Sequence, residues 1–281
     1  MKIKAELEPG KVAMITGGSS GIGKAIGCEL AKKGMHVWLL AQRQEILDSA
    51  RLEIEAFRQN LGQRIAAISA DVSNLDQVHK AFEQVTETSG SPYLLINSAG
   101  ITYPGYIQDI DINIFNRMIE VNYLGTVYTI KEILPEMIKR RSGYIVNISS
   151  VAGFLGVYGY SAYGASKFAV RGFSDTLRSE MRLYGIGVST VFPPDTDTPQ
   201  LEYENRFKPP ETKAVAGNAS VMSARDVAVA TIKGIQRGNN LIFPGFESQL
   251  IFRLNCLFGN LLAMFLDKQT ESVHKKRISS Q

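Results

Sequence analysis

The sequence predicts an α/β fold, a doubly wound parallel sheet of about seven strands with helices on both faces and an apolar helical extension at the C-terminus. Short apolar runs alternate with longer stretches of mixed polarity, which is typical of parallel strands joined by crossover helices. A glycine-rich turn separates the first run from the stretch after it. Apolar residues make up 44% of the 281 residues and charged residues 21%, which are ordinary values for a globular chain with a large core.

The runs that we expect to form strands are apolar nearly throughout, as strands covered by helices on both faces must be. They occupy residues 12–16, 37–41, 65–69, 93–97, 144–148, 186–192 and 241–243. The stretches between them are long enough for helices and have the mixed polarity of helices with one solvent face. These occupy residues 22–33, 44–60, 74–88, 112–139, 162–184 and 224–236. No repeat or low-complexity linker divides the series, so residues 1–246 are predicted to form one domain.

Two segments depart from the alternation. Residues 193–221 contain Pro193, Pro194, Pro199, Pro209 and Pro210, and we expect an irregular loop long enough to cover a substrate. Residues 247–281 form a separate C-terminal extension, an apolar helix followed by a basic tail.

Charge and cysteine content exclude several classes of protein. Lysine and arginine outnumber aspartate and glutamate by 31 to 27, and this net charge of +4 is too small to argue for nucleic-acid binding. Cys28 and Cys256 cannot form a disulfide framework, and no Cys/His cluster has the spacing of zinc ligands. The first ten residues carry charges where a signal peptide needs an apolar centre. We therefore expect a cytoplasmic protein without a metal site.

The glycine-rich turn reads Thr16-Gly17-Gly18-Ser19-Ser20-Gly21-Ile22-Gly23 and lies between a predicted strand and a predicted helix. Glycines allow the backbone to turn tightly and to approach a pyrophosphate, whose charge is met by free amide groups and the helix dipole. A glycine-rich turn alone can also be an ordinary loop. Its position between strand and helix favours a dinucleotide site.

The second predicted strand ends in Leu39-Leu40-Ala41-Gln42-Arg43. In a dinucleotide fold, an acidic residue at this end binds a free ribose 2′-hydroxyl, and an arginine accommodates a 2′-phosphate. No acidic residue is present there, so Arg43 favours NADP over NAD. A solvated arginine at the start of a helix is the alternative.

Tyr163 and Lys167 lie four residues apart in a predicted helix, which places both side chains on one face. A nearby ammonium stabilises a phenolate and lowers the pKa of the phenol, which would make the two a proton-transfer pair. Ser150 follows the strand before this helix, where its hydroxyl can return beside Tyr163. Pairs with this spacing are also common on helix surfaces, so the pair alone decides little.

With these motifs and Asn97-Ser98-Ala99-Gly100, residues 9–245 resemble the short-chain dehydrogenase/reductase family, whose fold is Rossmann-like. The resemblance implies a catalytic set of Ser150, Tyr163, Lys167 and Asn122. In it, Tyr163 donates a proton to a ketone, Ser150 binds the developing oxyanion, Lys167 holds the nicotinamide ribose and lowers the pKa of the phenol, and Asn122 orders a water. The resemblance also implies an NADPH site made of Gly17, Ser19, Ser20, Gly21, Ile22, Gly23, Arg43, Asp71, Val72, Asn97, Ala99, Gly100, Tyr163, Lys167, Pro193, Thr196 and Thr198.

The stretch from Pro193 to Pro199 resembles one branch of that family more closely, because Pro194 stands where most members have glycine. Members of this branch reduce 3-ketodihydrosphingosine, a long-chain 3-keto amino alcohol, with NADPH. The family resemblance further implies that Asp71 contacts adenine, Asn97 shapes the floor of the cofactor cleft and Thr198 reaches the nicotinamide carboxamide. Alternatively, Asp71 and Asn97 can cap helices and Asn122 can satisfy buried backbone groups. Two other functions remain open. One is reduction of a steroid, retinoid or 3-oxoacyl substrate, and the other is non-catalytic NADP binding by a regulator.

The apolar part of the extension, Leu250 to Leu266, is interrupted only by Arg253, Asn255 and Asn260. A membrane-spanning helix needs about 20 apolar residues, and a central arginine costs roughly 2.5 kcal/mol or more on insertion. We therefore expect peripheral contact, with residues 250–266 in a membrane surface and Lys275, Lys276 and Arg277 at anionic headgroups. This surface would be cytosolic, on the endoplasmic reticulum of a eukaryote or the inner membrane of a bacterium. The alternative is a helix buried in the interface of a homo-oligomer, which we expect the protein to form.

Overall fold

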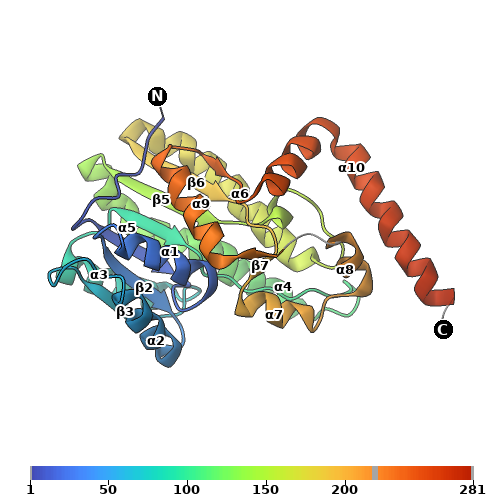
Figure 1. Cartoon of the computed structure of the whole chain (residues 1–281), viewed down its shortest axis with the longest axis horizontal. Coiled ribbons are helices and arrows are strands. Elements are labelled where there is room, and N and C mark those ends of the chain that lie inside the picture. Colours follow the sequence, from blue (N-terminus) through green and yellow to red (C-terminus); the bar gives the residue numbers. More distant parts are fainter. Residues whose placement is uncertain (1, 217–220, 280–281) are drawn as a thin grey trace.

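The computed structural model describes residues 2–216 and 221–279, with the backbone alone at 215, 216, 278 and 279. Seven strands form one parallel sheet in the order β3-β2-β1-β4-β5-β6-β9 (Figure 1). The strands are β1 (Val12–Thr16), β2 (His36–Ala41), β3 (Ile65–Ser69), β4 (Leu94–Asn97), β5 (Gly143–Ile148), β6 (Ile186–Val191) and β9 (Leu241–Ile242). The predicted fold class is confirmed, and each predicted strand is present within two residues at either end.

Helices cover both faces of the sheet, and each face has its own apolar core. Ile15 of β1 packs in one core with α1 (Gly21–Ala31), α2 (Gln44–Glu55) and α9 (Ala224–Gln236). Met14, the neighbour of Ile15, points to the other face and packs with α3 (Leu75–Ser89), α5 (Gly125–Arg140) and α6 (Ser161–Met181). Strands buried on both sides are apolar at consecutive positions, which is why these segments were recognisable in the sequence.

The order of the strands reverses at β1, which pairs with β2 on one side and β4 on the other. Thr16 ends β1 level with Leu40 of β2 and Asn97 of β4. In open parallel sheets, ligands bind outside the carboxyl ends of the strands at this reversal. The glycine-rich turn after β1 therefore lies at the position where ligands bind in such sheets.

The helix predicted over 112–139 consists of three parts. It begins as α4 (Ile112–Met118), continues as a π-helix (Ile119–Leu124) and ends as α5. π-helical turns inside α-helices are rare and often occur at functional sites. This one contains Asn122.

The prediction of an irregular loop over 193–221 is wrong. The segment contains a short strand, β7 (Thr196–Asp197), and two helices, α7 (Pro199–Asn205) and α8 (Pro210–Ala216), and β7 pairs with β8 (Met222–Ser223). Thr198 caps α7 by accepting a hydrogen bond from the amide of Leu201 at 3.3 Å, and Pro199 occupies the first turn. Proline is well suited to the first turn of a helix, so the prolines here begin helices rather than prevent them.

The C-terminal helix is longer than predicted. α10 (Phe246–Ser279) has 34 residues and bends at Phe258, whose φ of −136° is not helical. Phe252 of α10 packs against Phe154, Phe192 and Phe243, and Asn255 donates to the Phe154 carbonyl at 2.9 Å. Figure 1 shows the helix on the side of the molecule opposite β3. Of the described helices, the span Phe246–Arg277 is the one long and apolar enough, by length and composition, to cross a membrane.

Candidate active site

The turn between β1 and α1 requires its glycines. Gly17 has a φ of +66°, and a Cβ there would lie 2.7 Å from the amide nitrogen of Ala99. A Cβ on Gly23 would collide with the carbonyl oxygen of Gly17. Thr16 accepts hydrogen bonds from the amides of Ser98 and Ala99, each at 3.2 Å, which fastens the turn to the end of β4. The resulting bare backbone at a helix N-terminus is suited to a pyrophosphate.

A cavity of about 710 Å³ opens along this turn and continues to α10. Most residues predicted for the site line it, namely Gly17, Ser19, Ser20, Gly21, Ile22, Arg43, Val72, Ala99, Gly100, Ser150, Tyr163, Lys167, Pro193, Thr196 and Thr198. Its far end is lined by apolar side chains of α10, including Ile251, Leu262, Phe265 and Leu266. One cavity therefore joins a dinucleotide cradle to an apolar compartment.

Four predicted site residues do not line the cavity: Gly23, Asp71, Asn97 and Asn122. Asp71 accepts hydrogen bonds from the amide and hydroxyl of Ser73 at 2.9 and 2.6 Å, and it forms an ion pair with Arg117 at 3.4 Å. Burial acts to raise its pKa, but these hydrogen bonds and the Arg117 charge outweigh burial and lower it. In this structure Asp71 shapes the turn after β3.

Asn97 is buried and connects elements behind the cavity wall. Its amide donates to Asn147 of β5 at 2.9 Å, and it accepts from the Thr129 hydroxyl at 2.7 Å. Asn147 in turn donates to Ser174 of α6 at 2.8 Å. Asn97 therefore supports the floor of the cleft from below without facing it.

Asn122 holds the segment after β4 in place. Its side chain accepts from the amide of Ile101 at 2.8 Å and donates to the Ile101 carbonyl at 3.0 Å. It also donates to the Ser166 hydroxyl, one residue from Lys167, at 2.9 Å. The π-helical turn thus joins α6 to Ile101, directly after the Asn97–Gly100 motif, and Lys167 Nζ lies near Gly100.

Tyr163 and Ser150 meet on the cavity wall. Ser150 follows β5 and caps a short 3₁₀ turn, Val151–Gly153, by accepting from the amide of Ala152 at 3.2 Å. Its hydroxyl also hydrogen-bonds to Tyr163, which lies in the first turn of α6. Burial is the largest cause of a raised pKa for the Tyr163 phenol, followed by the Glu204 charge; the hydrogen bonds to Ser150 and Gln200 act in the opposite direction.

The predicted direction for the Tyr163 pKa is therefore wrong for this structure. Lys167 lies close to Tyr163, with its Nζ 5.7 Å from the ring centroid, and its Nζ donates to the Ile148 carbonyl at 3.0 Å. Burial lowers the pKa of Lys167 to about 8. Helical spacing correctly placed the two side chains together, but the loss of solvent around the phenol outweighs the field of the ammonium.

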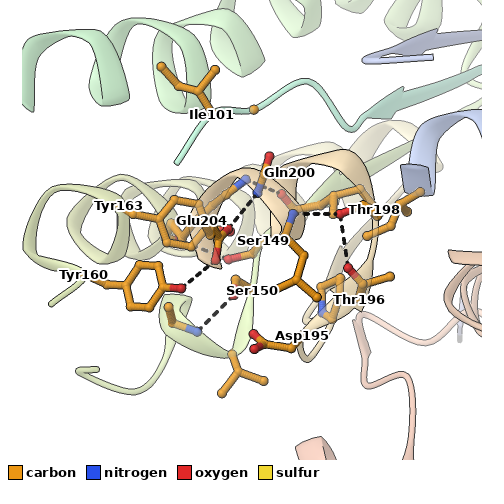
Figure 2. Close-up of a pocket in the computed structure, with 18 of the residues that line it drawn as sticks. Ile101, Ser149, Ser150, Tyr160, Tyr163, Asp195, Thr196, Thr198, Gln200 and Glu204 are labelled. Carbon is orange, nitrogen blue, oxygen red and sulfur yellow. Dashed lines mark hydrogen bonds between the residues drawn. The ribbon is translucent and has the colours of Figure 1, made fainter. Parts of the chain in front are cut away.

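A polar cluster beside Tyr163 was not predicted from the sequence. Tyr160 donates to Glu204 at 2.5 Å and Gln200 donates to Glu204 at 3.4 Å (Figure 2). Lys208 forms ion pairs with Glu204 and Asp195. All five residues line the cavity. Glu204 and Lys208 are four residues apart, a helical spacing that could have been noticed. This spacing was not interpreted, because residues 193–221 were predicted to be irregular and the spacing indicates a contact only in a helix.

Comparison with known proteins agrees with this geometry. The family model of the short chain dehydrogenases matches residues 11–208. The chain belongs to the short-chain dehydrogenase family. It is an oxidoreductase, and the family and enzyme class predicted from the sequence are confirmed.

Two curated relatives carry more specific names. A 3-ketodihydrosphingosine reductase of Bos taurus is 39% identical over 249 residues, which cover 88% of this chain and 75% of the relative. A 3-dehydrosphinganine reductase of Danio rerio is 39% identical over 248 residues, with the same two shares. Among solved structures, a short chain dehydrogenase/reductase from Burkholderia phymatum in complex with NAD has a TM-score of 0.79 and 26% identity, over 92% of this chain and 97% of that one.

Proposed function

We propose that this short-chain dehydrogenase reduces 3-ketodihydrosphingosine to dihydrosphingosine with NADPH, in the synthesis of sphingolipids. The names of the relatives at 39% identity support this substrate. The observation that carries the proposal is the continuity of the cavity from Ser150 and Tyr163 to the apolar side chains of α10. A long-chain ketone can place its carbonyl at the hydroxyls and its alkyl chain in the apolar compartment.

The reaction needs a hydride for the carbonyl carbon and a proton for the carbonyl oxygen, and a bound reduced nicotinamide supplies the hydride and is itself oxidised. Tyr163 supplies the proton, since burial raises the pKa of its phenol and keeps it protonated at neutral pH. Ser150, hydrogen-bonded to Tyr163, donates to the same oxygen as negative charge develops. A donor of this kind is worth about 2.7 to 4 kcal/mol in other enzymes.

The remaining predicted residues have supporting roles in this proposal. Lys167 lies within reach of Gly100 and holds the nicotinamide ribose, while Asn122 keeps the segment around Ile101 and α6 in register. The bare backbone from Gly17 to Gly23 binds the pyrophosphate. Arg43 lines the cavity and is exposed at the end of β2, where a guanidinium can pair with a 2′-phosphate.

The site would take its substrate from a lipid surface. We propose that the protein works at the cytosolic face of a membrane, with α10 as the peripheral contact. α10 both lines the cavity and exposes large apolar side chains, among them Leu257 and Leu261. An alkyl chain could then pass from lipid into the cavity along one helix.

The test is consumption of NADPH by the purified enzyme with 3-ketodihydrosphingosine, a steroid ketone and a 3-oxoacyl ester, each repeated with NADH. We expect turnover of the sphingoid ketone with a preference for NADPH. Tyr163→Phe should bind the cofactor normally and lose about 100-fold or more in kcat, because it lacks the transferable proton. Turnover of the steroid or the ester alone would overturn the substrate, a preference for NADH would overturn the role of Arg43, and unchanged turnover by Tyr163→Phe would overturn the proton donor.

A further inference from the structure

An acidic cluster is built into the cavity wall beside Tyr163, and the reduction step does not use it. Its members are Glu204, Asp195 and Lys208, all from the segment that follows β6. The side chains of Glu204 and Lys208 are 8% and 4% exposed, so both charges are almost fully withdrawn from water. Burying a charged group destabilises the fold unless the charge is paired, so the presence of these charges on the cavity wall suggests a function.

The charges within the cluster do not balance. The Lys208 ammonium lies 3.0 Å from an oxygen of Asp195 and 3.6 Å from an oxygen of Glu204, so two carboxylates share one cation. Tyr160 adds a hydrogen bond to Glu204 at 2.5 Å, which brings a polar hydrogen but no charge. One negative charge is left over on the cavity wall beside Tyr163, while α10 lines the cavity with apolar side chains and with Glu247, Ser248 and Gln269.

This charge lies next to the reacting end of the cavity. Gln200 donates to Glu204 at 3.4 Å, and the ring of Tyr160, which also donates to Glu204, lies 5.6 Å from the ring of Tyr163, so the carboxylate is one side chain away from the phenol. Figure 2 shows Glu204 and Gln200 together beside Tyr163, with Tyr160 pointing at the carboxylate. The charge of Glu204 acts on the Tyr163 hydroxyl and raises its pKa. A cation bound at Glu204 would therefore lie beside the carbonyl that Tyr163 protonates.

We infer that Glu204, assisted by Asp195, binds the ammonium group of the substrate and makes the enzyme selective for 2-amino ketones. The inference rests on the proposed function, since 3-ketodihydrosphingosine carries its amino group on the carbon adjacent to the carbonyl. When the carbonyl oxygen is held by Tyr163 and Ser150, the ammonium is the next polar group along the molecule. It supplies the second cation that the two carboxylates lack.

Such a site discriminates against neutral ketones. A steroid or a 3-oxoacyl ester in the same cavity brings no cation, so the excess negative charge of the cluster would lose its hydration without compensation, which disfavours a neutral ligand. Arg43 and Arg117 line another part of the cavity, toward the ends of β2 and β3. The cationic groups thus gather where an anionic dinucleotide binds, and the excess negative charge gathers where the amine binds.

The first experiment varies the substrate and leaves the protein unchanged. Wild-type kcat/KM is measured for 3-ketodihydrosphingosine, for its N-acetyl derivative and for the des-amino ketone of the same chain length. We expect the two uncharged ketones to fall about tenfold or more below the amino ketone, because they cannot pair with the carboxylate. Equal values for all three would overturn the inference and leave the proposed reduction of long-chain ketones standing.

The second experiment varies the carboxylate. Glu204→Gln keeps the size of the side chain and an acceptor for Tyr160, and the exposed Glu202→Gln on the same helix is the matched control. We expect Glu204→Gln to raise KM for the amino ketone and to reduce its advantage over the des-amino ketone about tenfold, with the des-amino ketone little affected. Glu202→Gln should change neither. An equal loss on both substrates would assign Glu204 a structural role and overturn the inference.

Failure of the proposed function and failure of the amine site give different results. If the wild-type enzyme turns over neither long-chain ketone but reduces a steroid or an ester, the proposed function fails and the amine site fails with it. If Glu204→Gln does not fold, Asp195→Asn repeats the comparison at the less buried carboxylate, whose side chain is 42% exposed. Loss of selectivity for the amine in that variant supports the site, and unchanged selectivity in it overturns the site.

Discussion

Lys167 is a charged group held almost without solvent. Its side chain is buried beside Tyr163, and its ammonium donates to the Ile148 carbonyl at 3.0 Å. Burial lowers its pKa from 10.5 to about 8, because a charge loses its hydration there. The protonated lysine therefore destabilises the folded protein, but it keeps a cation in the proposed cofactor site.

The lowered pKa of Lys167 predicts how the stability of the folded protein depends on pH. Between pH 8 and 10.5 the unfolded chain retains the lysine proton and the folded chain loses it, so the free energy of unfolding should rise with pH. Relative to Lys167→Met, the rise should approach roughly 3 kcal/mol over that window. Urea unfolding of both proteins without cofactor, at a series of pH values, measures it. The exposed Lys131→Met is the control, and a wild-type curve parallel to that of Lys167→Met would contradict the prediction.

The sequence predicted which residues meet at this site more reliably than it predicted their protonation. Spacing placed Tyr163 above Lys167 because an α-helix repeats every 3.6 residues, a local property. The direction of a pKa shift depends on how much solvent surrounds the group, and that depends on every element packed against it. For the same reason, the sequence did not show which partners Asn97 has below the floor of the cleft, and tertiary packing provides them in Asn147 and Thr129.

At the scale of elements, α10 is tied to the domain by a buried carboxylate. Glu211 of α8 is fully buried, accepts from Tyr106 at 2.8 Å and lies 3.0 Å from His274 of α10. Arg277, one turn further along α10, forms an ion pair with Glu211 at 3.5 Å and donates to the hydroxyl of Tyr106. This cluster fastens the second half of α10 over the cavity.

Acid should release this half of α10. Burial acts to raise the pKa of Glu211, but the hydrogen bonds from His274 and Tyr106 and the charge of Arg277 outweigh it and lower the pKa. A carboxyl with a lowered pKa stabilises the folded state above its unfolded pKa, and this stabilisation is lost as pH falls through the folded value. Hydrogen exchange of residues 259–277, corrected for intrinsic rates, should therefore become faster as pH drops below about 4.

The variant Glu211→Gln separates this cluster from general acid unfolding. It lacks the titrating group, so exchange in residues 259–277 should already be faster at pH 7 and should change less with acid. Glu271→Gln, an exposed residue of the same helix that pairs with Lys275 at 3.6 Å, is the control and should behave as wild type. If Glu211→Gln retained full protection at pH 7, the cluster would not be what holds α10.

The regular elements were predictable where the pattern is local, and the segment after β6 was not. The central strands are buried at every position because helices cover both faces, and they are apolar at most positions, so their sequence alone identifies them. α7 and α8 have seven residues each, too short to show a helical repeat, and isolated helices of that length are unstable. Tertiary contacts hold them, such as Lys208 with Asp195 and Thr212 with the Tyr158 carbonyl at 2.9 Å.

At the scale of the whole molecule, the two sides of α10 face different surroundings. One stripe, which includes Ile251, Leu262 and Leu266, lines the cavity. The other stripe exposes large apolar side chains that do not line the cavity: Leu250, Leu254, Leu257, Phe258, Leu261 and Met264. An apolar surface of this size on a soluble protein usually marks a contact with a membrane or another protein.

The exposed stripe predicts reversible binding to anionic lipid, since Lys275 and Lys276 follow it on the same helix. Leu257 and Leu261 are 72% and 63% exposed and do not line the cavity, so Leu257→Glu with Leu261→Glu should reduce co-sedimentation with phosphatidylserine-containing vesicles about tenfold while the cavity stays intact. Leu183→Glu, a 74% exposed leucine outside α10, is the control and should bind vesicles as wild type does.

Turnover of a short-chain amino ketone by the double variant in detergent-free solution should be unchanged, because only delivery from lipid is impaired. If the double variant instead converted a dimer to a monomer in sedimentation equilibrium, and wild type did not bind vesicles, α10 would be a subunit interface.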